Sequence, residues 1–332
     1  MIAVISIHIH PFESIRDNLE YHYLGILINQ GARFAVPFFF VISGFFFAKK
    51  VKSVGSVYEI AARSLKRLAM VWLFFSIIYI LPYNIFSVFD YGVYGPVKII
   101  YWHVLNIIKN PVTFIFEGSS GHLWFLVSLA NAVLISALFL RYWRHQPLIP
   151  LIIVSVALYV FGLLAKAYSE TSIGININFN TRDGPFFSTI YFVLGYAMSE
   201  FEFAPKHFIY GLLIAVFGYS IHFCEIYYLF TTYNVSPTSH DYVVGTLFEG
   251  IGASLMALSN HPLLNIKGLS NIGKYTLGIY GIHIAFVEML MQFDKQFTSP
   301  AWQIGNIFIV LLLSVIFTIS LSKFARLKMV LM

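Results

Sequence analysis

Charge is scarce in this sequence of 332 residues. Only 11% of the residues are Asp, Glu, Lys or Arg, whereas an ordinary soluble domain carries about 25%. The chain therefore has too few charges to cover a water-facing surface. Hydrophobic residues make up 58% of it, and the mean hydropathy is +0.77. This composition excludes a soluble globular protein and predicts an integral membrane protein that crosses the bilayer many times.

Cysteine is almost absent as well. The single thiol, Cys224, excludes a disulfide framework and any zinc or iron–sulfur site built on cysteines, so we assign it a packing role and expect no metal. The net charge is +6, but basic and aromatic residues do not interleave as on a nucleic-acid-binding surface, and we expect no nucleic-acid partner.

Long apolar runs recur along the whole chain, and none alternates as a strand of a membrane barrel does. The pattern predicts an all-α polytopic protein, with residues 1–332 forming one membrane-embedded domain. About ten helices are expected, at 1–10, 33–48, 67–86, 122–141, 148–168, 186–199, 208–229, 244–259, 275–292 and 303–322.

The first apolar run is too short to span a bilayer. It has no basic flank and no small-residue cleavage site, so it is not a signal peptide. The first helix is therefore expected to be truncated: either the protein begins upstream of Met1, which we favour, or the first helix is incomplete.

The positions of Lys and Arg predict the orientation, because short cytoplasmic loops carry the excess of basic residues. Most of the 21 basic residues fall in one set of alternate loops. We expect both termini to be cytoplasmic, in an inner (cytoplasmic) membrane, and the loops near 11–32, 87–121, 169–185, 230–243 and 293–302 to lie outside.

Polar residues in membrane helices are costly, so they mark candidate sites. His8 and His10 stand near the outer end of the first helix, and two residues of helix point them about 200° apart. We expect only one of them to face the bundle. A histidine there either forms a hydrogen bond at the membrane interface or acts as a general base, because imidazole titrates near neutral pH.

Basic residues precede the third predicted span. Ser56 and Glu59 have capping-box spacing, which predicts a helix start. Arg63 and Arg67 then lie one turn apart with Lys66 beside them, a cationic patch that suits phosphate groups. Anchoring at the cytoplasmic membrane surface explains the same residues equally simply.

Other polar positions have the same two interpretations. His122 and His283 either line a site or bond another helix. Arg33 and Arg182, at outer helix ends, either contact the acceptor or a developing oxyanion, or anchor to headgroups. Trp124 is either a sugar-stacking platform or an interfacial anchor. The Ser43-Gly44 pair either allows close helix packing or lines a cavity.

Five segments in this order carry a resemblance to a known family. They are VISIH ending at His8, RFAVPFFFVISGFFF at 33–47, RSLKR at 63–67, HLWFL at 122–126 and SNIGKYTLGIYGIH at 270–283. On these segments the chain resembles the acyltransferase-3 family of polytopic membrane acyltransferases, and within it the O-acetyltransferases of surface glycans. The similarity covers nearly the whole chain.

The resemblance implies transfer of an acyl group, usually acetyl from cytoplasmic acetyl-CoA, to a hydroxyl of a cell-surface or lipid-linked glycan. Acyl-CoA would be a co-substrate, with no cofactor bound permanently. His8 would match the essential first-helix histidine, and it acts either as general base or through an acyl-histidine.

For acyl-CoA binding, the resemblance implies Ser43, Gly44, Arg63 and Arg67. The family's basic motif reads Arg-x-x-Arg, whereas Ser64 stands here in Arg63-x-x-x-Arg67, so we add Lys66 to the dock. The candidates for contacting the acceptor or the oxyanion are Arg33, His122, Trp124, Arg182 and His283.

A membrane transporter or flippase of a glycan or lipid precursor is the alternative function. Transporters often show internal repeats with paired broken helices, and this sequence shows no such symmetry. Consumption of a thioester discriminates the two classes.

Overall fold

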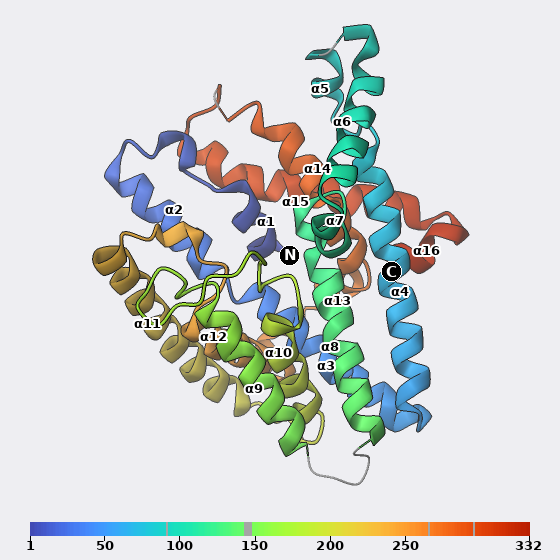
Figure 1. Cartoon of the computed structure of the whole chain (residues 1–332), viewed down its shortest axis with the longest axis vertical. Coiled ribbons are helices and arrows are strands. Elements are labelled where there is room, and N and C mark those ends of the chain that lie inside the picture. The colour runs from blue at the N-terminus through green and yellow to red at the C-terminus, as the bar shows by residue number, and fades with distance from the viewer. Residues whose placement is uncertain (91, 143–147, 265, 295) are drawn as a thin grey trace. The chain divides into compact units, whose positions relative to one another are not determined.

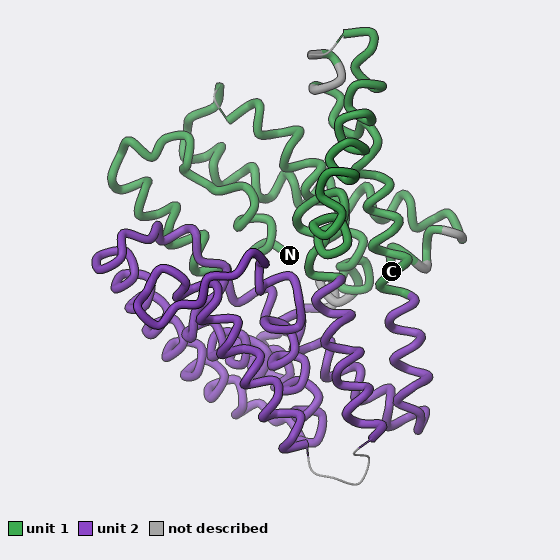
Figure 2. Tube along the Cα trace, in the orientation of Figure 1, with its two compact units in different colours: residues 1–32, 67–126, 267–332 green, residues 33–66, 127–266 purple. Residues whose placement is uncertain are grey.

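A computed structural model describes residues 1–90, 92–142, 148–264, 266–294 and 296–332 (Figure 1). Within those ranges the chain is helical and has no strand, which confirms the all-α expectation. Contacts divide it into two compact units, and each is described by itself (Figure 2).

Unit 1 comprises residues 1–32, 67–126 and 267–332. Its elements are α1 (Ile2–Ile9), η1 (Glu13–Ile15), α2 (Leu19–Gly31), most of α4 (Val57–Ile80), α5 (Ile85–Asp90), η2 (Gly92–Tyr94), α6 (Gly95–Lys109), α7 (Pro111–Glu117), η3 (Gly121–Leu123), α13 (Lys267–Gly273), α14 (Thr276–Met291), α15 (Pro300–Ser322) and α16 (Ala325–Leu331).

Unit 2 comprises residues 33–66 and 127–266. It contains α3 (Ala35–Val54), the start of α4, most of α8 (Trp124–Tyr142), α9 (Ile149–Leu164), α10 (Pro185–Met198), α11 (His207–Tyr233), η4 (Pro237–Ser239), α12 (Val244–Leu258) and η5 (Pro262–Leu264). Helix α3 packs on α10 and α12, α9 on α10, and α11 on α12.

Four helical stretches in the described residues are long and apolar enough to cross a membrane: Leu19–Val54, Gly121–Tyr142, His207–Tyr233 and Pro300–Ser322. The bent pair 92–109 and 111–117 makes five if it counts as one span, and α9, α10, α12 and α14 are shorter apolar helices. The protein is therefore a multi-pass membrane protein, while the count of ten spans stays a prediction.

Two of the stretches expected as outer loops, 11–32 and 87–121, contain helices, and their place outside the membrane stays a prediction. Helix α2 starts because the Asn18 side chain accepts hydrogen bonds from the backbone N–H groups of Glu20 and Tyr21. Its polar side chains hid a helical segment from a search for apolar runs. The second stretch contains α5, α6 and α7, and residue 91 within it lies outside the described residues, as does residue 295 of the expected loop 293–302.

Helices α6 and α7 meet at an angle of 104°. Pro111 is the first residue of α7 and disfavours helical geometry at Asn110, whose φ and ψ are −127° and 59°. The chain therefore turns sharply before it reaches His122.

Close backbone contact joins α3 to α10 in unit 2. A Cβ added to Gly44 would lie 2.0 Å from the carbonyl oxygen of Phe192, and one added to Gly195 would lie 1.9 Å from that of Val41. Only glycine fits at either position, which is the packing device that small residues provide in membrane helices.

Charged contacts lie at both ends of α3. Arg33 lies two residues before the helix and pairs with Asp241 at 3.1 Å, whereas Lys52 in its last turn pairs with Glu200 at 2.9 Å. The nineteen-residue separation of Arg33 and Lys52 corresponds to about 28 Å of helix, close to the roughly 30 Å hydrocarbon thickness of a bilayer. Polar ends and an apolar middle are what a spanning helix requires.

The lone thiol does not pack inside unit 2. Cys224 lies on an exposed face of α11, so the packing role expected for it was wrong.

Filling the contact between α3 and α10 should destabilise the protein. We expect Gly44→Ala to lower the stability by about 1–3 kcal/mol or more, because the new methyl group meets backbone atoms. Thermal unfolding in detergent, followed by circular dichroism, measures the change. In the matched control Gly31→Ala, the new methyl meets no atom within 4 Å apart from its chain neighbours and the backbone of its own helix. A loss as large as that of Gly44→Ala would refute the explanation.

Candidate active site

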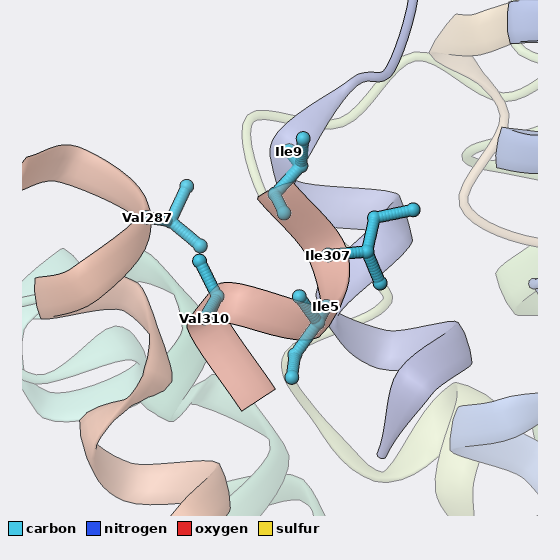
Figure 3. Packing of buried hydrophobic residues seen from close by; sticks show 5 residues of the cluster. All are labelled: Ile5, Ile9, Val287, Ile307 and Val310. Carbon is cyan, nitrogen blue, oxygen red and sulfur yellow. The ribbon is translucent and has the colours of Figure 1, made fainter. Parts of the chain in front are cut away.

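Apolar packing fixes the short helix α1 within unit 1. Ile5 and Ile9 are buried against Val287 of α14 and against Ile307 and Val310 of α15 (Figure 3). The remaining faces of α1 are therefore available to polar side chains.

The end of α1 separates its two histidines. His10 adopts a left-handed conformation with φ 50° and ends the helix, and the N–H of Phe12 then donates to Oε1 of Gln303 at 2.9 Å. His10 is exposed, whereas His8 is half-buried and faces two further histidines. The expectation that only one of the pair faces the bundle agrees with this geometry.

Three histidine rings lie together in unit 1. The ring centroids of His8 and His283 are 5.3 Å apart, those of His122 and His283 are 5.3 Å apart, and those of His8 and His122 are 6.5 Å apart. The rings come from α1, η3 and α14, which are distant in sequence. Three of the sequence candidates thus form one cluster.

The ring of His122 has partners for both of its nitrogens. Nε2 lies 3.2 Å from the carbonyl oxygen of Gly281, which only accepts, so Nε2 carries the proton. Nδ1 lies 2.9 Å from the Ser120 hydroxyl, which then donates to it. His122 is 4% exposed. We interpret it as a structural member of the cluster, because neither nitrogen is left for an acceptor or an oxyanion.

The ring of His283 is held at one nitrogen only. Its Nδ1 lies 2.5 Å from the carbonyl oxygen of Tyr280 and must donate to it. Nε2 is buried and has no hydrogen-bond partner in the part of the chain that the structure describes. His283 therefore presents a proton acceptor, which an oxyanion does not need.

Tyrosines that sequence reasoning missed surround the cluster. The Tyr79 hydroxyl donates to the Gly281 carbonyl at 2.9 Å and accepts from the Ala285 N–H at 3.2 Å, and its ring centroid is 5.1 Å from that of His122. The Tyr280 hydroxyl donates to the carbonyl oxygen of His122. The sequence signal for Tyr280 was its position in an apolar run three residues before His283.

Asn29 of α2 is a further residue without a sequence signal, because the apolar pattern predicts a loop over its segment. Its Nδ2 donates to the carbonyl oxygen of Ile7 at 3.3 Å, and Nε2 of Gln30 donates to its Oδ1 at 3.0 Å. Both amides are fully buried. They fix the backbone next to His8.

Trp124 is 8% exposed and follows directly on η3. Little of its ring is open to a sugar in this structure, so stacking against an acceptor stays a prediction.

The basic residues predicted to bind acyl-CoA lie on α4. Arg63 is exposed and pairs with Glu59 one turn earlier. The backbone N–H of Glu59 donates to the Ser56 hydroxyl oxygen at 3.3 Å, which is the expected N-terminal cap of the helix. Lys66 is exposed. Nε of Arg67 is buried without a partner among the described residues. A role in binding CoA stays a prediction for all three.

Gly44 lies against α10, and Ser43 beside it is half-buried. Their packing function is evident from the geometry, while acyl-CoA binding by either stays a prediction.

A second group of predicted residues meets in unit 2. Asp241 pairs with Arg33 at 3.1 Å, with Lys166 at 3.4 Å and with Arg182 at 3.5 Å, and Arg182 also pairs with Asp183 at 2.9 Å. Asp241 itself was not predicted, because a loop aspartate has no distinctive sequence signal.

The three cations control the ionisation of that carboxyl. Burial alone would raise the pKa of Asp241, but attraction to Arg182, Arg33 and Lys166 outweighs it and lowers the pKa from 3.8 to about 2. The carboxylate is therefore charged at neutral pH.

A buried pair in unit 2 was missed as well. Nδ1 of His222 on α11 lies 2.7 Å from Oε1 of Glu249 on α12, and both side chains are at most 1% exposed.

No group of three or more His, Cys, Asp or Glu side chains within the described ranges could hold a metal ion.

The fold and the cluster define a class of protein: a multi-pass, all-helical membrane protein in which three histidines from distant parts of the chain lie together in one unit. A family model described as an acyltransferase domain matches residues 1–322. The chain belongs to the acyltransferase-3 family of membrane acyltransferases.

Two curated relatives from Enterococcus faecalis, each named amino-acid racemase, are similar to this chain. The first is 25% identical over 331 residues, covering 94% of this chain and 43% of the relative; the second is 26% identical over 233 residues, covering 65% and 30%. The chain thus spans less than half the length of these relatives. No solved structure matches it.

The ion-pair group should contribute stability that depends on pH. Because the pKa of Asp241 is lowered on folding, its contribution should be complete above pH ~4 and be lost as the pH falls towards ~2. We expect Asp241→Asn to destabilise the protein by about 1–3 kcal/mol at pH 7 and to flatten this acid dependence. Melting temperatures at several pH values test it.

Asp17→Asn is the control, since Asp17 is exposed in unit 1. An equal loss of stability in both variants would contradict the role assigned to the three cations.

Proposed function

We propose that this protein transfers an acyl group, for which we assign acetyl, from cytoplasmic acyl-CoA to a hydroxyl of a cell-surface or lipid-linked glycan, with His8 as the proton acceptor. Family membership supports acyl transfer in general. The donor, the acceptor and the residue roles are our inference from the site.

The observation that carries the proposal is the path of α4. Arg67 lies on the part of α4 that belongs to unit 1, and Tyr79 near the end of the helix contacts the histidine cluster of the same unit. Twelve residues of helix separate Arg67 from Tyr79, about 18 Å, which is comparable with the extended pantetheine arm between the phosphates and the thiol of CoA. A phosphate bound at Arg67 would thus leave the thioester within reach of the histidines.

The reaction then follows ordinary general-base chemistry. His8 accepts the proton of the acceptor hydroxyl as the oxygen attacks the thioester carbonyl. The tetrahedral intermediate expels the CoA thiolate, which takes the proton back from the imidazolium. An ester and free CoA result, and no proton is gained or lost. Attack by His8 itself, through an acyl-imidazole, balances equally and remains the alternative route.

The ionic ends of unit 2 fit the proposed orientation. Lys52 and Glu200 both come from segments expected in the cytoplasm, while Arg33, Lys166, Arg182 and Asp241 come from, or border, segments expected outside. We propose an inner-membrane protein with cytoplasmic termini, in which Arg33 and Arg182 are candidates for holding a polar acceptor on the outer side.

Removal of the base should abolish turnover without unfolding the protein. We expect His8→Gln to lower transfer of radiolabelled acetyl from acetyl-CoA to the membrane glycan fraction by about 10²- to 10⁴-fold. His10→Gln, two residues away and exposed, is the control and should stay active. Activity retained in His8→Gln would overturn the assignment, whereas a wild type that consumes no thioester would favour a transporter or flippase.

Loss of the donor contact should affect binding rather than chemistry. We expect Arg67→Gln to raise the KM for acetyl-CoA by about 10- to 100-fold with kcat nearly unchanged, because one charge-assisted phosphate contact contributes about 1.5–3 kcal/mol. Steady-state kinetics in detergent measures both constants. The exposed Arg16 serves as control in Arg16→Gln, and an unchanged KM for Arg67→Gln would remove α4 as the CoA dock.

A further inference from the structure

The tautomer of His283 is fixed by its backbone contact. Because the Tyr280 carbonyl only accepts, the 2.5 Å contact places the ring proton on Nδ1. The neutral ring then has a lone pair on Nε2, which is buried and has no partner within the described residues. A buried hydrogen-bond acceptor without a donor costs free energy, so the unpartnered Nε2 of His283 needs an explanation.

The His8 ring is near enough to provide one. Two imidazoles joined by an N–H···N bond of about 2.9 Å have centroids about 5 Å apart when the ring radii are added. The centroids of His8 and His283 are 5.3 Å apart with an interplanar angle of 55°. This separation is compatible with a hydrogen bond from an N–H of His8 to Nε2 of His283.

His122 does not compete for this contact, since Ser120 and Gly281 already engage its two nitrogens. The rings of Tyr79 and Tyr280 lie against those of His122 and His283 respectively. Of the two histidines beside His8, only His283 offers a free lone pair.

We propose that His283 is the positioning residue of the base: its Nε2 accepts a hydrogen bond from His8, which orients the His8 ring and stabilises the imidazolium that forms during acyl transfer. The inference rests on the function proposed above. Here a neutral imidazole accepts the hydrogen bond from the base, whereas in serine hydrolases a carboxylate accepts it.

The proton inventory stays balanced. As one nitrogen of His8 takes the hydroxyl proton, the N–H at the other becomes more acidic and its bond to His283 strengthens. No proton has to leave the pair, because the CoA thiolate later takes the same proton from His8. His283 therefore contacts neither the thioester nor the acceptor and acts through His8.

Two substitutions separate this role from a structural one. His283→Asn retains an amide donor near the position of Nδ1, which can bond the Tyr280 carbonyl, but has nothing at the position of Nε2. His283→Gln places an amide oxygen near the position of Nε2 and gives up the Tyr280 contact. The exposed His22 of α2 provides the control His22→Asn.

We expect His283→Asn to lower kcat by about 10- to 100-fold with the KM for acetyl-CoA within about twofold of wild type. His283→Gln should retain more activity than His283→Asn although it loses the backbone contact, and His22→Asn should match wild type. Full activity in His283→Asn, or a Gln variant less active than the Asn variant, would overturn the proposal.

A spectroscopic measurement tests the contact independently of turnover. Histidine-labelled protein in nanodiscs should show a strongly deshielded ring N–H proton that disappears in His8→Gln and in His283→Asn but persists in His22→Asn. Its absence from wild type would overturn the contact even if acyl transfer is observed. Its presence in a protein without acyl transfer would retain the contact and reject the proposed function.

Discussion

Contact of α1 with α14 and α15 determines where His8 lies in unit 1. Helix α1 has only eight residues, and a helix of that length is not stable by itself. Burial of Ile5 and Ile9 against Val287, Ile307 and Val310 supplies the apolar contact that it needs. His8 lies on the adjacent side of α1, three residues after Ile5, and its ring meets that of His283 on the same helix α14. The proposed chemistry therefore depends on this apolar packing.

Burial then sets the chemistry of the cluster. In apolar surroundings, burial of a neutral imidazole costs less free energy than burial of an imidazolium, and each buried N–H group needs a hydrogen-bond acceptor. Backbone carbonyls of one α14 segment serve for two of the rings: Tyr280 for His283 and Gly281 for His122. Gly281 is glycine because a Cβ would lie 2.1 Å from the Phe75 ring. Close approach of α4 and α14 thereby brings Tyr79 into the same group.

Unit 2 is held together by close helix packing and by ion pairs. Its helices pack through glycine contacts, as at Gly44 and Gly195, and its charges gather at helix ends. Two ionisable side chains inside the unit, His222 and Glu249, are partners of each other at 2.7 Å. Such a scaffold places Arg33 and Arg182 around one carboxylate, and neither cation stands alone.

The sequence by itself determined the class of protein, most of the long apolar helices, and the residue types of the candidate site, because the bilayer imposes its requirements on composition and run length. His8, His122 and His283 were found as single polar residues in apolar surroundings. The sequence did not predict helix α2 or its buried Asn29, since capping and burial, not apolarity, make that segment helical. Only the tertiary structure decided that three histidines far apart in the chain share one cluster and that Asp241 joins three cations. It also decided which ring nitrogens are engaged, because hydrogen-bond partners come from other helices and periodicity within one helix carries no information about them.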